Sequence, residues 1–292
     1  MDRYEELFSK YDFDHLDRSL IQKNVDDILS QNFKKYDVNT VYSNILSCID
    51  LTSLNSNDTN YSITSLVENI NSFDDEFEIL PHPAALCVYP AFVQTVKDAL
   101  QEDLEIATVI GFPHSNTFVE VKIAEIGLSI MDGATEIDVV MPLSKFCSQN
   151  YGEVYDELVE IKSACQTAKL KVILESGLID DPVELKKAAI LAMVAGADFI
   201  KTSTGKGYKG ATLEDAYVMA SAIKEFNEMN NRKVGLKISG GVSDTATAVS
   251  YYTIAASILG EEWMNSSLFR IGASRLTNKI LSSLAKREVE YF

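Results

Sequence analysis

The sequence has little of several features that mark common classes of protein. Its 292 residues include four cysteines and three histidines, and no apolar run approaches the length of a membrane span. The cysteines form no Cys-x-x-Cys pair and the histidines stand singly, so the sequence predicts neither a disulfide scaffold nor a metal site. The start of the chain is charged and lacks the apolar segment of a signal peptide. We therefore expect a cytoplasmic protein with reduced thiols and no membrane contact.

Positive charge is also scarce. Lys and Arg number 26 against 43 Asp and Glu, which gives a formal net charge of −17. Nucleic-acid-binding proteins carry a basic stripe and anionic membranes attract basic segments, so this balance predicts neither as a partner. An anionic small molecule is compatible with the sequence, provided that lysines or backbone N–H groups gather locally.

What the chain does contain is a regular alternation of short apolar runs with longer helical stretches. Eight runs of strand type lie at residues 47–50, 85–89, 106–110, 136–140, 171–175, 198–201, 234–237 and 268–271. Their spacing of roughly 20 to 40 residues holds a strand, a loop and a crossover helix. Eight such units predict an α/β fold of the (β/α)8 TIM-barrel type. The competing fold is a doubly wound open sheet, which usually has fewer strands.

Three segments are expected along the chain. Residues 1–41 show the apolar spacing of amphipathic helices and are interpreted as an N-terminal helical extension packed on the main domain. Residues 42–285 form the barrel, and residues 286–292 a disordered tail. The polar stretches 52–62 and 71–78 are interpreted as loops, the second acidic and solvated.

Ionisable residues end several predicted strands, where a TIM barrel places its active site. They are Asp50, Asp138, Glu175, Lys201 and Lys237. Lys201 and Lys237 end neighbouring strands, about 5 Å apart. Repulsion and removal from water both favour a neutral amine there, which can form a Schiff base with a carbonyl. An inward-facing Asp138 is placed for proton transfer.

Glycines follow the last two predicted strands. Gly240 and Gly241 come after the seventh, and Gly272 and Ser274 belong to the segment after the eighth. Loops at these places commonly bind phosphate in TIM barrels, because glycines let backbone N–H groups approach the anion. Lys206 would add positive charge. The alternative interpretation is that the glycines only make tight turns and the lysines are solvated strand-end residues.

Seven motifs run through residues 42–280 of the chain. They lie at residues 49–54, 85–90, 111–113, 133–140, 197–206, 235–241 and 269–274. Together they resemble the deoxyribose-phosphate aldolases, class I aldolases built on a (β/α)8 barrel, and look more like the longer eukaryotic-type members. The resemblance implies reversible cleavage of 2-deoxy-D-ribose 5-phosphate to D-glyceraldehyde 3-phosphate and acetaldehyde, in deoxyribonucleotide catabolism. It implies no metal or other cofactor.

The resemblance also implies roles, residue by residue. Lys201 matches the Schiff-base lysine, Lys237 the neighbour that keeps it neutral, and Asp138 the proton relay. Asp50 matches a polar residue of the substrate site that supports the lysines. The other positions that match substrate or phosphate contacts are Thr52, Leu54, Thr204, Lys206, Gly240, Gly241, Gly272 and Ser274. Some members use a C-terminal tyrosine as a mobile proton shuttle, and Tyr291 is the next-to-last residue here.

The sequence departs from the family pattern near the phosphate loops. Ile238 and Ser239 replace a Pro-Ala pair, Ser243 stands where Arg is common, and Arg275 stands where Ser or Thr is usual. We hypothesise that Arg275 supplies the positive charge missing at Ser243. Two alternatives stay open: a catalytically weak relative that binds a phosphosugar or a partner, and a Schiff-base aldolase for a longer ketose phosphate. A homodimer is expected from the resemblance.

Overall fold

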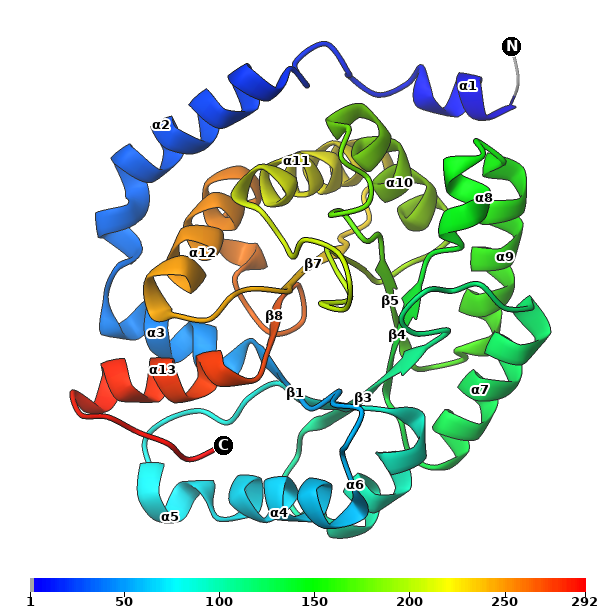
Figure 1. Ribbon diagram of the computed structural model, residues 1–292. Coiled ribbons are helices and arrows are strands. Elements are labelled where there is room, and N and C mark those ends of the chain that lie inside the picture. Colours follow the sequence, from blue (N-terminus) through cyan, green and yellow to red (C-terminus); the bar gives the residue numbers. More distant parts are fainter. Residues whose placement is uncertain (1–2) are drawn as a thin grey trace.

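Eight short parallel strands close into a barrel, with helices around the outside (Figure 1). The computed structural model describes residues 3–292. The strands pair in chain order, and β1 pairs with β8 to close the sheet. They are β1 (Ile49–Thr52), β2 (Ala85–Val88), β3 (Glu105–Ile110), β4 (Glu136–Val140), β5 (Lys169–Ile173), β6 (Phe199–Lys201), β7 (Gly235–Ser239) and β8 (Phe269–Ala273). The predicted TIM barrel is confirmed, and each strand lies at or close to its predicted run.

The strands are buried on both faces, which explains their nearly continuous apolar sequences. In β4, Ile137 and Val139 belong to the apolar core between the strands and the helices. Glu136 and Asp138 alternate with them along the strand and therefore point into the barrel. A second, smaller apolar cluster that includes Ala107 occupies part of the barrel interior.

Some of the surrounding helices begin at a side chain that accepts hydrogen bonds from their first N–H groups. Asp181 accepts from the N–H of Val183, and Thr212 forms a capping box with Asp215. The helices are α4 (Asn60–Asn71), α6 (Val93–Ala99), α7 (Val119–Met131), α9 (Tyr151–Ala164), α10 (Pro182–Val194), α11 (Leu213–Asn230), α12 (Thr245–Leu259) and α13 (Arg275–Ala285). Shorter turns are η1 (Pro90–Phe92), α8 (Leu143–Cys147) and η2 (Glu261–Trp263). Within residues 3–292, no helix combines the length and apolarity needed to cross a membrane.

The N-terminal segment is helical and lies outside the barrel. It contains α1 (Arg3–Phe8), α2 (Arg18–Tyr36) and α3 (Asn39–Ser47). α2 runs along α11 and α12 and buries Ile21 and Val25 (Figure 1). α3 packs on α12 and α13, and it spans the boundary that the sequence placed between residues 41 and 42.

Both loops expected near β1 and β2 contain helix. The stretch 71–78 is not a solvated loop: it holds α5 (Phe73–Phe77), and both phenylalanines of this helix are buried. The end of the stretch 52–62 is also helical, because α4 begins at Asn60. Three consecutive acidic side chains on α5 gave it the composition of a loop, while its two aromatic rings are covered by a segment from the far end of the chain.

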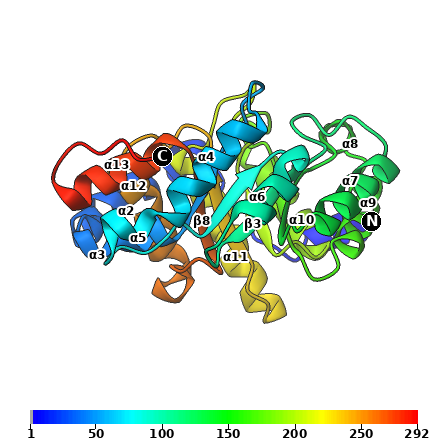
Figure 2. The same ribbon diagram turned by 90° about the horizontal axis from the view of Figure 1, so that it is seen from below.

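That segment is the C-terminal tail, and the prediction of disorder there is wrong. The tail lies beside α4 and α5 (Figures 1 and 2). The Tyr291 hydroxyl donates to the backbone oxygen of Asn69 at 2.9 Å. The rings of Tyr291 and Phe292 both pack against Phe73. Aromatic packing and backbone hydrogen bonds therefore hold the tail on the barrel.

Candidate active site

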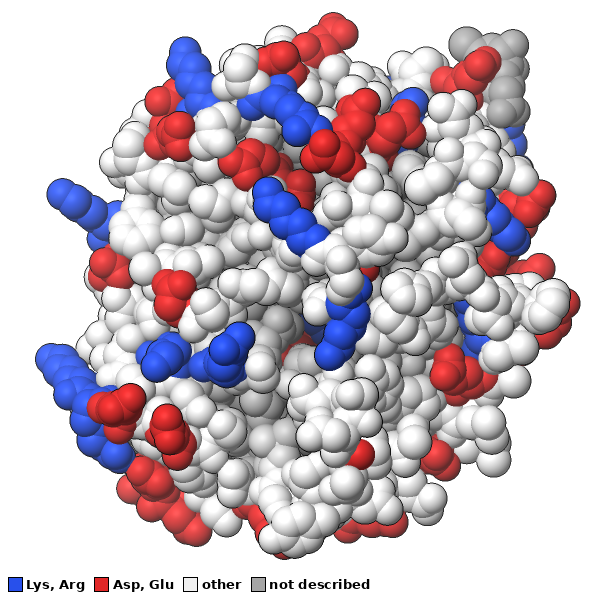
Figure 3. Space-filling view, in the orientation of Figure 1, with Lys and Arg blue, Asp and Glu red and all other residues white. Residues whose placement is uncertain are grey.

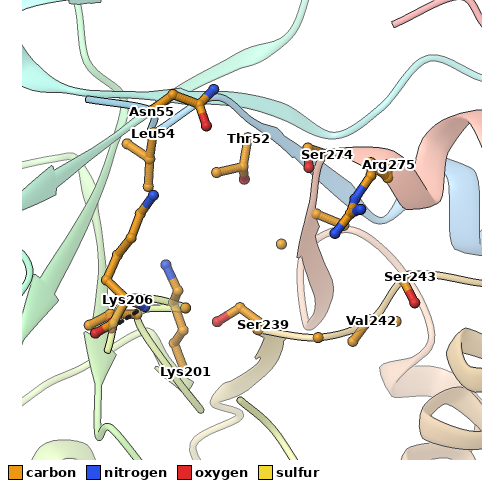
Figure 4. A pocket seen from close by; sticks show the side chains of 16 residues that line it. Thr52, Leu54, Asn55, Lys201, Lys206, Ser239, Val242, Ser243, Ser274 and Arg275 are labelled. Carbon is orange, nitrogen blue, oxygen red and sulfur yellow. Dashed lines mark hydrogen bonds between the residues drawn. The ribbon is translucent and has the colours of Figure 1, made fainter. Parts of the chain in front are cut away.

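A cavity of about 340 Å³ opens at the C-terminal ends of the strands (Figure 4). Nine of the residues matched to the family line it: Thr52, Leu54, Lys201, Thr204, Lys206, Gly240, Gly241, Gly272 and Ser274. The other lining residues are Asn55, Gly205, Ser239, Val242, Ser243, Ala273 and Arg275. The structure therefore brings together residues from β1, β6, β7, β8 and the loops that follow them.

The cavity is positively charged in a strongly negative protein. Among the described residues that line it, Lys201, Lys206 and Arg275 are basic and none is Asp or Glu. Lys206 and Arg275 approach from opposite sides (Figure 4). α13 begins at Arg275, so the positive end of its dipole also lies at the cavity. On this face of the molecule, acidic side chains lie mostly toward the edge (Figure 3). The cavity is suited to an anion.

Glycines shape one wall of the cavity. Gly240 and Gly241 have positive φ angles of 83° and 87°, which side chains rarely adopt. A Cβ on Gly240 would lie 2.9 Å from the Cα of Gly210, so the loops after β6 and β7 can touch only without it. The N–H of Ala211 donates to the oxygen of Gly240 at 3.1 Å and joins the two loops.

A buried glutamate holds the loop that carries Lys206. Glu175, another strand-end candidate, accepts hydrogen bonds from the N–H and the hydroxyl of Thr204. The Thr204 hydroxyl oxygen in turn accepts from the N–H of Lys206 at 3.0 Å. Glu175 therefore supports the cavity from behind rather than lining it. The sequence placed Thr204 at the substrate, and here its hydroxyl is already engaged in the loop.

Lys201 stands at the floor of the cavity. It ends β6, is almost fully buried, and its Nζ lies 2.8 Å from Oδ2 of Asp138. The Nζ of Lys237 lies 2.7 Å from the same oxygen. Asp138 and Lys237 are completely buried beneath the floor and do not line the cavity. The three residues predicted to carry the chemistry are thus in contact.

The surroundings push these three groups toward different charge states. Burial lowers the pKa of Lys201; Asp138 opposes this shift and Lys237 adds to it. Although burial opposes it, Asp138 raises the pKa of Lys237. Although burial opposes it too, the surrounding lysines hold the pKa of Asp138 well below its ordinary value. An ammonium on Lys237 and a carboxylate on Asp138 therefore accompany a Lys201 that is shifted toward the neutral amine.

Asp50 lies deeper in the barrel. It accepts hydrogen bonds from Lys237 and Arg270, and Lys171 lies 3.6 Å away. Asp50 is fully buried and does not line the cavity. Its carboxylate contacts Lys237, one of the lysines that the resemblance gave it to support. Gly272 leaves room for that contact, because a Cβ there would lie 3.1 Å from Cε of Lys237.

Three buried ionisable residues were missed by the sequence argument. Glu136, Lys171 and Arg270 are almost completely buried inside the barrel and contact the groups just described. A signal for them exists: Glu136 precedes Asp138 by two residues, so both share one face of the strand. Arg270 and Gly272 are related in the same way on β8.

Comparison with known proteins places the chain in a family. A model described as DeoC/LacD family aldolase matches residues 45–260. The chain is also 40% identical, over 245 residues, to a Caenorhabditis elegans protein named "Putative deoxyribose-phosphate aldolase", covering 82% of this chain and 80% of that protein. The chain belongs to the DeoC/LacD family of aldolases. The resemblance drawn from the seven motifs is thereby confirmed.

Solved structures agree with this family. The tetrameric deoxyribose phosphate aldolase from Aeropyrum pernix is 27% identical with a TM-score of 0.68, and the match covers 88% of this chain and 97% of that one. A Toxoplasma gondii ME49 structure described as "a putative deoxyribose-phosphate aldolase" is 21% identical with a TM-score of 0.76, over 88% and 97% of the two chains. The second likeness supports the fold.

Proposed function

We propose that this DeoC/LacD aldolase reversibly cleaves 2-deoxy-D-ribose 5-phosphate into D-glyceraldehyde 3-phosphate and acetaldehyde through a Schiff base on Lys201. The observation that carries the proposal is a buried lysine, shifted toward its neutral form, at the floor of a cavity lined by basic residues. A neutral lysine amine attacks carbonyl carbon, and a basic cavity attracts a phosphate ester. The names of the relatives supply the substrate class.

The phosphate would lie at the outer part of the cavity. Lys206, Arg275 and the glycine loops after β7 and β8 offer charge and backbone N–H groups there. In this arrangement Arg275 would replace the cation absent at Ser243, as the sequence hypothesis proposes. Binding of the remote phosphate would fix the sugar and hold its aldehyde carbon over Lys201.

The reaction needs proton transfers but no electron acceptor besides the imine. Lys201 adds to the aldehyde carbon, and loss of water gives an iminium ion. The hydroxyl on carbon three loses its proton, the bond between carbons two and three breaks, and its electrons enter the iminium to form an enamine. Protonation of carbon two and hydrolysis then release acetaldehyde and regenerate the amine. Oδ2 of Asp138 lies 2.8 Å from Nζ of Lys201, so its carboxylate would stabilise the positive iminium. It would also accept hydrogen bonds from the water and hydroxyl groups that give up protons in the reaction.

The decisive experiment traps the Schiff base. The protein is incubated with acetaldehyde and borohydride, and its peptides are mapped by mass. We expect a two-carbon adduct on Lys201, and none at that position in a folded Lys201→Met variant. A folded parent protein without the adduct would reject the aldolase mechanism and favour a phosphosugar- or partner-binding relative. A panel of aldehyde donors then separates this reaction from that of an aldolase for longer ketose phosphates.

Three expectations from the sequence are not decided by the fold or the relatives. The homodimer, the cytoplasmic location and the role in deoxyribonucleotide catabolism stay predictions. Sedimentation of the purified protein tests the first, since a dimer of this chain differs twofold in mass from a tetramer of it, the assembly named for the Aeropyrum relative.

A further inference from the structure

The barrel interior holds more ionisable groups than the proposed reaction uses. We call the following seven buried side chains the charge cluster: Asp50, Glu136, Asp138, Lys171, Lys201, Lys237 and Arg270. The mechanism above gives roles at the reacting atoms to Lys201 and Asp138, with Lys237 beside them. Glu136, Lys171 and Arg270 do not line the cavity. Removing such charged groups from water costs free energy, which favours a functional reason for keeping them.

Contacts within the cluster leave Lys201 at its margin. Arg270 pairs with Asp50 and Glu136. Lys171 pairs with Glu136, and lies 3.1 Å from Asp138 and 3.6 Å from Asp50. Lys237 pairs with Asp50 and Asp138. Within the described chain, Lys201 is paired with Asp138, and it shares that carboxylate with Lys171 and Lys237.

The cluster has one cation too many. Its three carboxylates face four basic groups when every group is ionised. Lys169 and Glu105 lie at the edge of the cluster, where Lys169 pairs with both Glu136 and Glu105. Adding these two residues to the count adds one charge of each sign, so the excess of one cation stays the same. An uncompensated charge inside a protein is relieved most easily by loss of a proton. Arg270 cannot lose one, and Lys171 and Lys237 hold two or more carboxylates each, so the excess falls on Lys201.

The directions of the pKa shifts follow this count. Although burial opposes the change, the carboxylates raise the pKa values of Lys171 and Arg270 above their ordinary values, as they do for Lys237. The pKa of Lys201 is lowered. Cys87 on β2 also lies near Lys201. Burial raises the pKa of its thiol, so Cys87 adds no charge to the cluster.

We infer that Lys171, Glu136 and Arg270 are positioning residues that hold Lys201 as a neutral amine through the charge balance of the cluster, without touching substrate. This inference rests on the proposed function. The titratable groups that act most strongly on Lys201 are Asp138 (β4), Lys237 (β7) and Cys87 (β2). The rest of the charge cluster lies buried in the same barrel interior, namely Asp50 (β1), Glu136 (β4), Lys171 (β5) and Arg270 (β8), and Lys206 on the loop after β6 lines the same cavity as Lys201. β3 presents apolar Ala107 and Val109 to the interior.

The test changes the charge count in both directions. Lys171→Met removes the excess cation, so Lys201 should keep its proton to higher pH. We expect the pH midpoint for trapping the acetaldehyde imine to move to the alkaline side by about one unit or more, with about a tenfold slower trapping at neutral pH. Glu136→Gln increases the excess and should move the midpoint to the acid side.

Two further variants separate charge balance from packing. Lys171→Arg keeps the charge and should leave the midpoint close to that of the parent. The double variant Lys171→Met/Glu136→Gln removes one charge of each sign, restores the excess of one, and should bring the midpoint back toward the parent value. Circular dichroism identifies folded variants, and Glu136→Gln alone tests the inference if Lys171→Met does not fold.

The results of this test distinguish failure of the charge-balance inference from failure of the proposed function. A parent protein that gives no adduct on Lys201 rejects the aldolase mechanism itself. A parent that does give the adduct, together with folded single variants whose midpoints do not move in opposite directions, overturns the charge-balance inference. A double variant that is more strongly shifted than Lys171→Met also overturns it, because that is the result of damaged packing.

Discussion

Two buried regions of this protein are filled by opposite kinds of side chain. Between the barrel and its helices, apolar side chains such as Ile137 and Val139 fill the space. Inside the barrel, their strand neighbours Glu136 and Asp138 are equally buried but carry carboxyl groups that contact basic side chains. The outer region gains stability from apolar area removed from water. In the inner region, desolvation and neighbouring charge favour a neutral lysine, which is the form that the proposed reaction needs.

The largest expected effect separates reactivity from stability inside the barrel. Lys201→Met should lower the rate of cleavage of 2-deoxyribose 5-phosphate by at least about a thousandfold, because no other group supplies the nucleophile. Its denaturation midpoint should be no lower than that of the parent, because the variant removes a poorly compensated buried amine. Steady-state kinetics and urea unfolding measure the two effects. A clearly destabilised variant would mean that Lys201 is a structural ion-pair partner.

The matching change in the outer region should have the reverse profile. Ile137 precedes Asp138 in the chain and is fully buried among apolar side chains. Ile137→Ala should reduce the free energy of unfolding by about 2–5 kcal/mol through lost contacts and a cavity. The kcat of the folded fraction should stay close to that of the parent. A large fall in kcat without loss of stability would erase the distinction between the two regions.

Acid should weaken the inner region selectively. The lysines hold the pKa of Asp138 below its ordinary value, so the folded state binds fewer protons than the unfolded chain. Its contribution to stability is complete above the ordinary aspartate pKa of about 4 and is lost as the pH falls toward the lower folded value. The melting temperature of the parent should therefore fall more steeply below this pH than that of Asp138→Asn. Ile137→Ala should keep the parent slope, and equal slopes in all three proteins would contradict the prediction.

The smallest effect concerns the cavity mouth, where charge is exposed. Arg275→Ala should raise the KM for 2-deoxyribose 5-phosphate about tenfold, the value of one charge-assisted contact. The KM for 2-deoxyribose without phosphate provides the control and should not change. An unchanged KM for the phosphorylated sugar would show that Arg275 does not replace the cation absent at Ser243.

The fold could be predicted because both faces of every strand are covered. This arrangement makes each strand an apolar run in the sequence, and eight such runs at regular spacing have few other solutions. The helix α5 was not predicted, because its local composition does not show that it is covered. Its Asp74, Asp75 and Glu76 are polar, and the burial of Phe73 and Phe77 depends on a tail more than 200 residues away in the chain.

The site was only partly predictable. Lys201, Lys237 and the glycine loops stand at strand ends, where their position alone draws attention. Glu136 and Arg270 lie inside strands and look like isolated charges in the sequence, yet they are paired across the closed barrel. Pairing over 134 positions of sequence separation follows from barrel closure, which local patterns do not encode.

The order in which the strands supply the charge cluster also bears on the making of the protein. Asp50 comes from the first strand and Arg270 from the last, 220 positions later, and they meet only when β1 pairs with β8. A growing chain that still lacks β8 leaves the barrel open to water, where a lysine is an ordinary protonated and unreactive amine. On the proposed mechanism, the reactive amine is therefore complete only once β8 has joined the barrel. We expect chains that end before β8 not to form the acetaldehyde adduct on Lys201.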